Sequence, residues 1–377
     1  MAEQPVRRGW KSPFFTGPLK IFTGLVFLMT LLSSFGGHID PLKVATPSLL
    51  SLFMPYLTLL SVILIIIWIL YRNVAFPIAG CVILIISISL MNNAIPFGYT
   101  RKPTPGAETF KIISWNVLHT RDIRQPDYPG NRAIEYMINS GADIICLTEL
   151  YNFSDKEMKK VSKALRDSFD TAYPYKAGPA NHDIKVISKY PVKIKKIPGL
   201  SLKERNRFDI FNVEFPDKRN LIVVMVHLYS YGLSKEEREV VTEIKSVRTA
   251  EKSMRELKGT IYSKMKTAFR NRTYKARVLR KILDELPPDQ PLIVCGDFND
   301  VPSSWTYNLI KGADLRDAYA ETNFGPASTY NLHLFYFHID QMLYRGNLRA
   351  LDLNIGKINT SDHYPLIGEF EFSSPLP

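Results

Sequence analysis

Residues 291–300 read Pro-Leu-Ile-Val-Cys-Gly-Asp-Phe-Asn-Asp and place polar side chains at the end of an apolar run. The run Pro291–Cys295 is typical of a strand that is buried on both faces. Asp297 and Asn299 are two residues apart, so both point to the same face of an extended segment. A carboxylate and an amide at a strand end are exposed at one rim of a sheet, where side chains from several strands can converge.

The same arrangement recurs along the chain. Polar residues end or closely follow further apolar runs: Asn116, Glu149, His227, Asp340, Asp362 and His363. A single residue of this kind usually belongs to a turn or caps a helix, but the recurrence indicates a shared site. Carboxylate and amide oxygens suit Mg²⁺ or Mn²⁺. The chain has three cysteines and no Cys/His cluster, which argues against zinc.

The region after residue 100 alternates strand-like and helical patterns. The hydrophobic share of 46% excludes a disordered chain. The mixture of elements indicates two sheets with helices outside them. The predicted strands are Phe110–Val117, Asp143–Leu147, Ile184–Ser188, Phe208–Phe215, Leu221–Leu228, Pro291–Cys295, Phe337–Leu343 and Leu366–Phe372. The predicted helices are Asn131–Ser140, Asp155–Phe169, Lys235–Lys258, Thr273–Leu286 and Ser304–Lys311.

Six short motifs occur in an order that resembles the endonuclease/exonuclease/phosphatase superfamily. They are Ser-Trp-Asn-Val, Leu-Thr-Glu, Val-His-Leu, Gly-Asp-Phe-Asn-Asp, His-Ile-Asp and Ser-Asp-His-Tyr-Pro, within residues 109–373. The resemblance implies an α/β fold, a four-layer sandwich of two packed mixed β-sheets flanked by helices. The site would lie at one rim of the two sheets. The preceding apolar region is similar to that of membrane-anchored bacterial members.

The resemblance also implies how the metal and the attacking water are held. Glu149 would be the principal ligand of Mg²⁺ (or Mn²⁺), with help from Asn116 and Asp362. Asp297 would orient or deprotonate the water, and Asn299 would bind the scissile phosphate.

Histidines would contact the phosphate oxygens and carry protons, according to the same resemblance. His227 and His363 take this role, Asp340 would orient His363, and Asp183 would be the acidic partner of His227. One departure is His338, which stands before the Ile-Asp pair where many relatives have arginine.

Two further residues are candidates for substrate binding. Tyr229 follows His227 by two residues and is expected to line the substrate groove. Arg277 lies in the helix that leads to the Gly-Asp-Phe-Asn strand, where relatives often have a basic residue.

The first hundred residues differ in composition from the rest. They carry six basic and two acidic residues, and the runs Leu49–Tyr71 and Val74–Tyr99 contain no charge. Each run is long enough for a hydrocarbon core of roughly 30 Å. A shorter run, Ile21–Gly37, is a third span or the core of a signal peptide. We therefore expect a membrane region over 1–100 with spans near 21–37, 49–71 and 74–96, a linker over 101–108 and a catalytic domain over 109–377.

The charges around these runs predict the topology. Basic residues precede the first run and Arg72 lies between the other two, so both places are expected in the cytoplasm. The catalytic domain then faces the non-cytoplasmic side, whether or not the first run is cleaved. The expected location is a bacterial inner membrane.

Residues 251–281 contain eleven basic and two acidic residues. Met254, Leu257, Ile261 and Met265 recur at helical spacing, which indicates an amphipathic helix. One interpretation is a solvated helix face. The other is a surface for an anionic partner, either lipid headgroups or a phosphate backbone.

The sequence thus favours a membrane-anchored, metal-dependent phosphodiesterase that acts by in-line attack of an activated water. A nuclease-like activity is the leading hypothesis. A phospholipid or sphingolipid phosphodiesterase and a phosphomonoesterase are alternatives. A non-catalytic binding module is the alternative of another class, and the presence of Glu149, Asp297 and His363 argues against it.

Overall fold

The computed structural model divides the chain into two compact units. One comprises Met1–Ile95 with Ser303–Trp305, and the other Pro96–Pro302 with Thr306–Pro377. The structure describes residues 13–91, 93–125, 128, 130–150, 161–179, 182–197, 206–232, 251–331 and 337–373, without the side chains of 13–15, 251–259 and 261–262. Much of the predicted helices Asp155–Phe169 and Lys235–Lys258 therefore lies outside the described residues.

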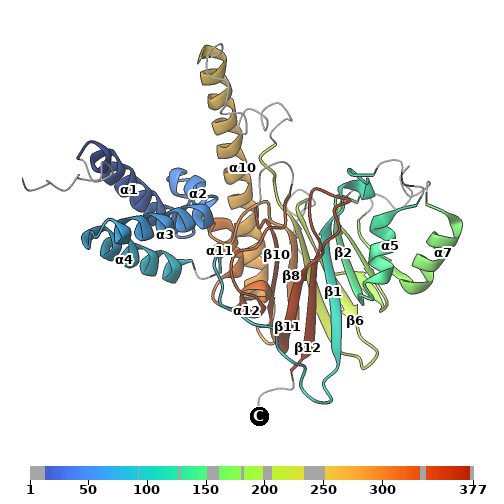
Figure 1. The fold of residues 1–377 in the computed structure, drawn as a ribbon. Coiled ribbons are helices and arrows are strands. Elements are labelled where there is room, and N and C mark those ends of the chain that lie inside the picture. The colour runs from blue at the N-terminus through green and yellow to red at the C-terminus, as the bar shows by residue number, and fades with distance from the viewer. Residues whose placement is uncertain are drawn as a thin grey trace, which may run out of the picture. The chain divides into compact units, whose positions relative to one another are not determined.

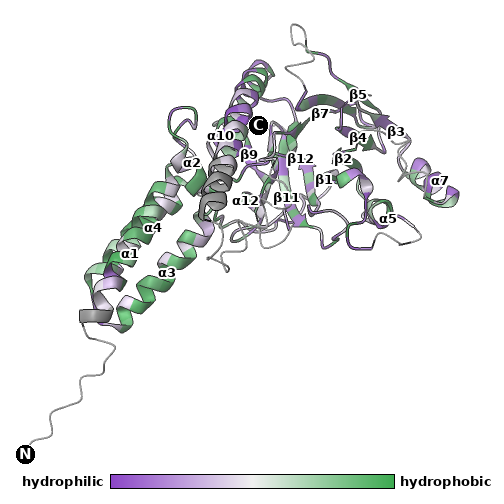
Figure 2. Ribbon diagram, turned by 90° about the horizontal axis from the view of Figure 1, so that it is seen from above, coloured by the Kyte–Doolittle hydropathy of each residue, from purple (hydrophilic) through white to green (hydrophobic). Residues whose placement is uncertain are grey.

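The first unit consists of predominantly apolar helices (Figure 2), which are joined by hydrogen bonds between a few polar side chains. Thr30 and Ser61 hydrogen-bond each other at 2.9 Å, and the Trp68 indole donates to Thr23 at 2.9 Å. Many of the large apolar side chains outside these contacts are exposed, as is typical of helices in lipid. The helices are α1 (Pro13–Ser34), α2 (Thr46–Ser51), α3 (Met54–Leu70) and α4 (Ala75–Leu90).

One of these helices is long and apolar enough to cross a membrane. This is the segment Thr16–Ser34 of α1, and a helix of this kind near the N-terminus is also typical of a signal sequence. The apolar helices α3 and α4 have 17 and 16 residues. The tight connection expected between them is present, and Arg72 adopts a positive φ of 57° there.

The second unit contains two six-stranded sheets. The order of the first sheet is β11-β12-β1-β2-β4-β3, in which β1 and β2 are parallel. The order of the second is β5-β6-β7-β8-β10-β9, in which β7 and β8 are parallel. The first-sheet strands are β1 (Thr109–Asn116), β2 (Ile144–Thr148), β3 (Tyr175–Ala177), β4 (Lys185–Ser188), β11 (Leu348–Ile355) and β12 (Leu366–Phe372). The second-sheet strands are β5 (Val192–Ile194), β6 (Phe208–Glu214), β7 (Asn220–His227), β8 (Leu292–Asp297), β9 (Arg316–Asp317) and β10 (Asp340–Arg345).

Helices cover the outer face of each sheet (Figure 1). α5 (Arg132–Asn139) and α7 (Lys163–Ala172) pack on the first sheet. α10 (Glu251–Glu285) and α11 (Trp305–Lys311) pack on the second. The predicted four-layer α/β sandwich is confirmed. Two short helices, η2 (Leu118–Thr120) and α12 (Ala318–Thr322), lie in connections.

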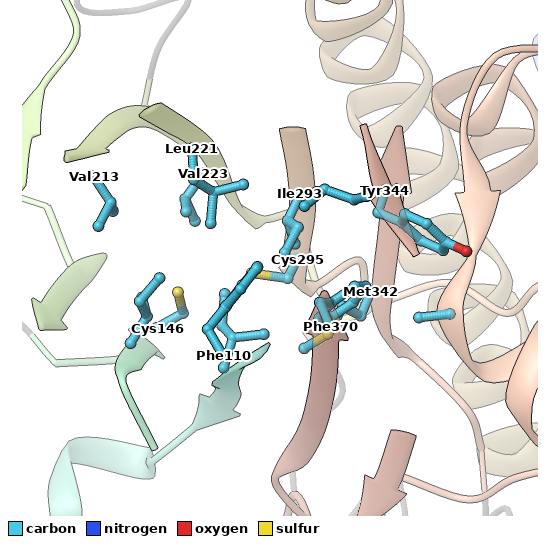
Figure 3. Close-up of a cluster of buried hydrophobic side chains, with 14 of the residues drawn as sticks. Phe110, Cys146, Val213, Leu221, Val223, Ile293, Cys295, Met342, Tyr344 and Phe370 are labelled. Carbon is cyan, nitrogen blue, oxygen red and sulfur yellow. The ribbon is translucent and has the colours of Figure 1, made fainter. Parts of the chain in front are cut away.

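The core between the sheets is made by alternate residues of their strands. Ile293 and Cys295 of β8 face the first sheet, while Leu292 and Val294 face α10. Figure 3 shows these inward side chains opposite Phe110 of β1 and others of the first sheet. All three cysteines lie in apolar runs of the sequence, which predicts three core thiols. Cys146 and Cys295 are completely buried in this layer and confirm the prediction, but Cys81 is exposed, so for that residue it is wrong.

Strand β11 is an element that the sequence analysis missed. Its pairing with β12 shifts between Ala350 and Asp352, which marks a bulge. The bulge interrupts the alternation of apolar and polar residues, so the strand lacks a regular period of two.

Residues 101–108, interpreted above as a linker, lie within the second unit and hydrogen-bond to its strands β11 and β12. The Arg101 amide donates to the Leu351 carbonyl at 2.7 Å. The Thr104 amide donates to the Glu371 carboxylate at 2.7 Å.

The basic segment 251–281 is not a uniformly solvated face. It is helical throughout, as part of α10, but Arg272, Lys275 and Arg280 are buried. Arg280 binds Asp314 at 2.9 Å and thus acts inside the fold. Only part of the segment's charge can therefore meet an external partner.

Candidate active site

The predicted site residues meet where parallel strands end. Asn116 at the end of β1 pairs with Thr148, the last residue of β2, directly before Glu149. On the other sheet, Asp297 at the end of β8 pairs with His227 of β7 and with Asp340 of β10. Strand register thus sets these polar residues at the same height, at one rim of the two sheets.

Asp297 lies at the centre of this group. Its Oδ1 accepts the backbone N–H of Asn299 at 2.8 Å, and its Oδ2 accepts Asn116 Nδ2 at 3.1 Å. The Nε2 atoms of His227 and His363 lie 3.9 and 3.7 Å from the same Oδ2. Burial raises the pKa of Asp297, and although the two histidines act in the opposite sense, the net pKa stays above the usual value.

Two histidine–carboxylate pairs flank Asp297, and both join the two sheets. His227 Nδ1 of β7 bonds Asp183 Oδ2, just before β4, at 2.6 Å. His363 Nδ1, just before β12, bonds Asp340 Oδ2 of β10 at 2.8 Å. The bond between Asn116 and Asp297 also runs from the first sheet to the second. The expected pairings of both histidines are present.

The carboxylates favour the charged form of both imidazoles. Burial alone would lower the pKa of His363, but the charges of Asp340 and Asp297 outweigh it and raise the pKa to about 10. Burial likewise opposes protonation of His227, but the hydrogen bond to Asp183 and the nearby carboxylates raise its pKa. The pKa of Asp183 is lowered, because the bond to His227 outweighs its burial.

Glu149 is the more accessible carboxylate of the site. Its side chain is 26% exposed, and its Oε1 accepts Asn116 Nδ2 at 2.9 Å. The Nε2 of His227 lies 3.8 Å from the same oxygen. Glu149 and Asn116 therefore stand together, next to Asp297, as the sequence predicted.

The donor set fits a hard divalent cation. Glu149 offers carboxylate oxygens at the rim, a ligand type that Mg²⁺ and Mn²⁺ prefer. The amide of Asn116 faces Glu149 with its nitrogen, while its oxygen accepts the Leu118 N–H at 3.2 Å, so the amide would have to turn over to add an oxygen ligand. Asp297, Asp340 and His363 also place one ligand atom each within 4.8 Å of one another. This second group is less suitable, because His363 and Asp340 already bond each other.

Asp362 stands apart from these contacts. It is partly buried, and its carboxylate accepts a long 3.4 Å bond from the Ser361 hydroxyl. Its charge contributes to the raised pKa of His363, which shows that it lies nearby. Its role as a metal ligand stays a prediction.

The predicted substrate-binding residues have different surroundings. Asn299 is buried, and its side-chain amide donates to the Leu228 carbonyl at 3.0 Å. Tyr229 is partly exposed beside the site, with the Arg207 guanidinium 4.2 Å from its ring centroid. Arg277 is exposed on α10.

Arg272 is a structural residue of the site that the sequence analysis did not single out. It is completely buried and donates to the carbonyls of Tyr229 (3.1 Å) and Asn299 (2.6 Å). Its guanidinium stacks on Tyr231 at 4.3 Å and lies 3.4 Å from Asp300. The helical spacing of the sequence could have identified it, because Arg272 falls on the same face as the buried residues Phe269, Ala276, Leu279 and Leu283.

Backbone strain gathers at the same rim. Glu149 and Asn299 have positive φ values of 56° and 51°, and so do Leu118, His119 and Thr120 after β1. Residues with side chains rarely adopt this conformation, and it persists where the surrounding structure fixes it. Here it turns the chain sharply at strand ends, which leaves the polar side chains at the rim.

Two family comparisons match different parts of the chain. The sequence model described as "Endonuclease/Exonuclease/phosphatase family" matches residues 113–363. A model described as a domain of unknown function matches residues 17–93. A search of curated proteins found no match.

Several solved structures are similar to the second unit. An endonuclease/exonuclease/phosphatase from Beutenbergia cavernae aligns with a TM-score of 0.45 and 13% identity, covering 71% of this chain and 72% of its own. ANGEL2, a 2',3'-cyclic phosphatase in complex with adenosine-2',3'-vanadate, gives 0.45 and 16% over 71% and 97%. The human Nocturnin catalytic domain gives 0.44 and 17% over 73% and 100%.

Proposed function

Because this chain belongs to the endonuclease/exonuclease/phosphatase family, whose members hydrolyse phosphoester bonds, we propose that it is a membrane-anchored, divalent-metal-dependent phosphodiesterase. The observation that carries the proposal is the pair of histidines held around Asp297. Each ring is fixed through Nδ1 by a carboxylate, and both Nε2 atoms face Asp297 Oδ2.

The imidazoles would act as donors to phosphate oxygens. The pKa of His363 is raised to about 10, so its Nε2 carries a proton at neutral pH, and the raised pKa of His227 favours the same charged form. The distances of 3.7 and 3.9 Å to Asp297 are longer than hydrogen bonds, so these protons remain available to a bound phosphate. Hydrolysis builds negative charge on the phosphate and leaving oxygens. A preorganised donor at such a place is worth about 3 kcal/mol of barrier.

Asp297 would orient and deprotonate the attacking water. Its Oδ1 is fixed by the Asn299 backbone, which leaves Oδ2 directed to the centre of the site. The raised pKa of the carboxyl makes it a better proton acceptor than an exposed aspartate. The backbone N–H of Asn299 thus holds Asp297 in place. We propose that the side-chain amide of Asn299 also contacts the phosphate.

Glu149, Asn116 and Asp362 would hold the cation. When bound, a divalent ion neutralises charge on a phosphate oxygen and on the leaving oxygen. In this chain, Asn116 also links Glu149 to Asp297 through one amide group, so the metal ligands and the water-orienting carboxylate share one support.

We infer that the enzyme is nuclease-like and that its nucleic-acid substrate binds along the exposed face of α10. Lys266, Arg270, Arg277 and Lys281 are exposed and follow one another by four, seven and four residues. This spacing places them on one side of the helix over about 22 Å. Exposed Tyr274 lies beside them, and a basic stripe with an aromatic residue suits a nucleic-acid backbone.

The apolar helices of the first unit favour a second candidate substrate. A phospholipid or sphingolipid would be supplied by the membrane in which α1, α3 and α4 are anchored. The catalytic unit would face the non-cytoplasmic side of a bacterial inner membrane. A cysteine introduced at exposed Lys218 tests this topology, since a membrane-impermeant maleimide should label it in cells with an opened outer membrane.

The function is tested with the full chain in lipid nanodiscs. It is incubated with Mg²⁺, and then with excess chelator, against plasmid DNA, RNA, sphingolipid vesicles and a bis-aryl phosphodiester. Chelator-sensitive cleavage of nucleic acid would support the nuclease, and cleavage of lipid alone would support the second candidate. Inactivity on all substrates, together with retained binding, would favour a non-catalytic binding module.

A variant separates the role of the basic stripe from the chemistry. Changing Lys266, Arg270, Arg277 and Lys281 to glutamine should weaken nucleic-acid binding and flatten its salt dependence. Turnover of the small bis-aryl diester should stay unchanged, because the four side chains are exposed on α10 and a small diester does not extend along this helix.

A further inference from the structure

Exposed aromatic side chains cluster at one place on the second unit. Phe324, Tyr99 and Phe97 are 76%, 71% and 62% exposed. They are the three most exposed large hydrophobic side chains among the described residues of this unit, and the next, Tyr274, is 55% exposed. We call these three residues the aromatic bridge. Aromatic exposure concentrated in this way marks an interaction surface.

The aromatic bridge is built by two segments that are distant in sequence. Phe97 and Phe324 form an antiparallel β-bridge, and their rings meet edge to face at 5.4 Å. The backbone of the same two segments is joined by three hydrogen bonds: Gly98 to Asn323, Tyr99 to Glu321 and Gly325 to Pro96. The exposed rings are therefore held in place by paired backbone.

Close packing fixes this geometry further. A Cβ on Gly98 would lie 2.4 Å from the Glu321 backbone, so only glycine allows the approach. Arg101 forms an ion pair with Glu321 at 2.8 Å and lies 5.9 Å from the Tyr99 ring centroid. Phenylalanine, tyrosine and arginine together are typical of the boundary between lipid tails and water.

The chain itself limits how far this surface can be from the bilayer. Helix α4 ends at Leu90, seven residues before Phe97. Seven extended residues reach at most about 25 Å. If α4 is held in a membrane, the aromatic bridge must therefore remain close to its surface.

We propose that the aromatic bridge inserts into the headgroup region of the bilayer that holds the apolar helices. The inference rests on the membrane anchoring proposed above. The contact would restrict the orientation of the second unit relative to the membrane, beyond what a seven-residue connection can do.

Fluorescence quenching in vesicles tests the contact. The full chain carries Cys81→Ser, which leaves only the two buried core thiols, and a bimane label on Phe324→Cys. It is reconstituted in phosphatidylcholine vesicles with or without a nitroxide near the lipid glycerol. Matched labels are placed on Lys218→Cys, in an exposed hairpin turn, and on Ile66→Cys, exposed on α3.

The label at position 324 should lose fluorescence to the nitroxide lipid and be shielded from aqueous iodide, whereas the label at 218 should behave in the opposite way. Adding Phe97→Ser and Tyr99→Ser should reduce the lipid quenching at 324. Quenching at 66 with none at 324, or no effect of the added serines, would overturn the proposal. Absence of quenching at 66 would instead overturn the anchoring itself and the proposal with it.

Discussion

Replacement of Arg272 by methionine tests how the site's rim is held. Methionine has a similar length and fits apolar surroundings, so the variant removes the charge with little change in volume. It also removes the donors to the carbonyls of Tyr229 and Asn299 and leaves Asp300 buried opposite an apolar side chain. Asp300 is 1% exposed and cannot turn to solvent without moving the loop after β8.

The expected loss of stability is large. Breaking a buried ion pair by removing one partner reduces the free energy of unfolding by about 4 kcal/mol, because the other charge stays buried and loses that counter-charge. For a unit of this size, that lowers the melting temperature by about 10 °C. A second change, Asp300→Asn, removes the remaining buried charge and keeps the Oδ1 that accepts the Val301 amide. The double variant should therefore recover much of the loss.

Thermal unfolding of the full chain in detergent, followed by tryptophan fluorescence, measures both variants. Phosphodiester turnover at a temperature below both transitions then separates folding from site geometry. Arg270→Met, on the exposed side of the same helix, is the matched control and should unfold like the parent protein. If Arg272→Met unfolds like this control, or if the double variant is less stable than the single one, the buried charge pair does not have the role inferred here.

Three further predictions concern the site and its surroundings. Asp340→Asn should lower the pKa of His363 from about 10, so the alkaline limb of the pH–rate profile should move to lower pH. A return of that pKa to about 6.5 would reduce the rate at pH 8 by about 30-fold, and an unmoved limb would point to another proton donor. Glu149→Gln should abolish both metal-dependent turnover and the rise in melting temperature that Mg²⁺ produces. The control Glu214→Gln, in an exposed hairpin, should keep both. If Mg²⁺ still raises the melting temperature of Glu149→Gln, the metal binds elsewhere. Burial lowers the pKa of His338 to about 4, so below about pH 6.5 this side chain binds a proton in the unfolded chain but not in the folded one. The free energy of unfolding should therefore fall by about 3 kcal/mol between about pH 6.5 and pH 4. His338→Gln should flatten this part of a plot of melting temperature against pH, and an unchanged plot would contradict the assignment.

The sequence predicted the centre of the site because strand ends are local features. Asp297, His227 and Asp340 each close an apolar run, and pairing of the strands then brings them to the same level. The pairing of the histidines with Asp183 and Asp340 followed from motif resemblance and not from spacing. The contacts that Asn299 makes with Asp297 and Leu228 depend on a positive φ, which no pattern of residue types reveals.

The basic segment shows where composition is insufficient. A count of charges cannot distinguish the buried Arg272 and Arg280 from the exposed Arg270 and Lys281, because all four belong to one helix. Their positions relative to the apolar stripe decide burial. Asp300 and Asp314, which pair with the buried cations, come from distant segments, although Arg280 also pairs with Asp284 of its own helix. Strand β11 was missed for a related reason, since its bulge hides the alternation.

Three hydrogen bonds join one sheet to the other at the rim, so the geometry of the active site depends on the distance between the sheets. The bonds of Asn116, His227 and His363 to their partners all lengthen together if the sheets slide or separate. Because a misplacement of about 1 Å can reduce a rate by about 10²-fold, pressure or mild denaturant that loosens the core between Phe110 and Cys295 should silence the protein while its strands and helices persist. Activity is then a property of the assembled sandwich, which neither sheet possesses alone.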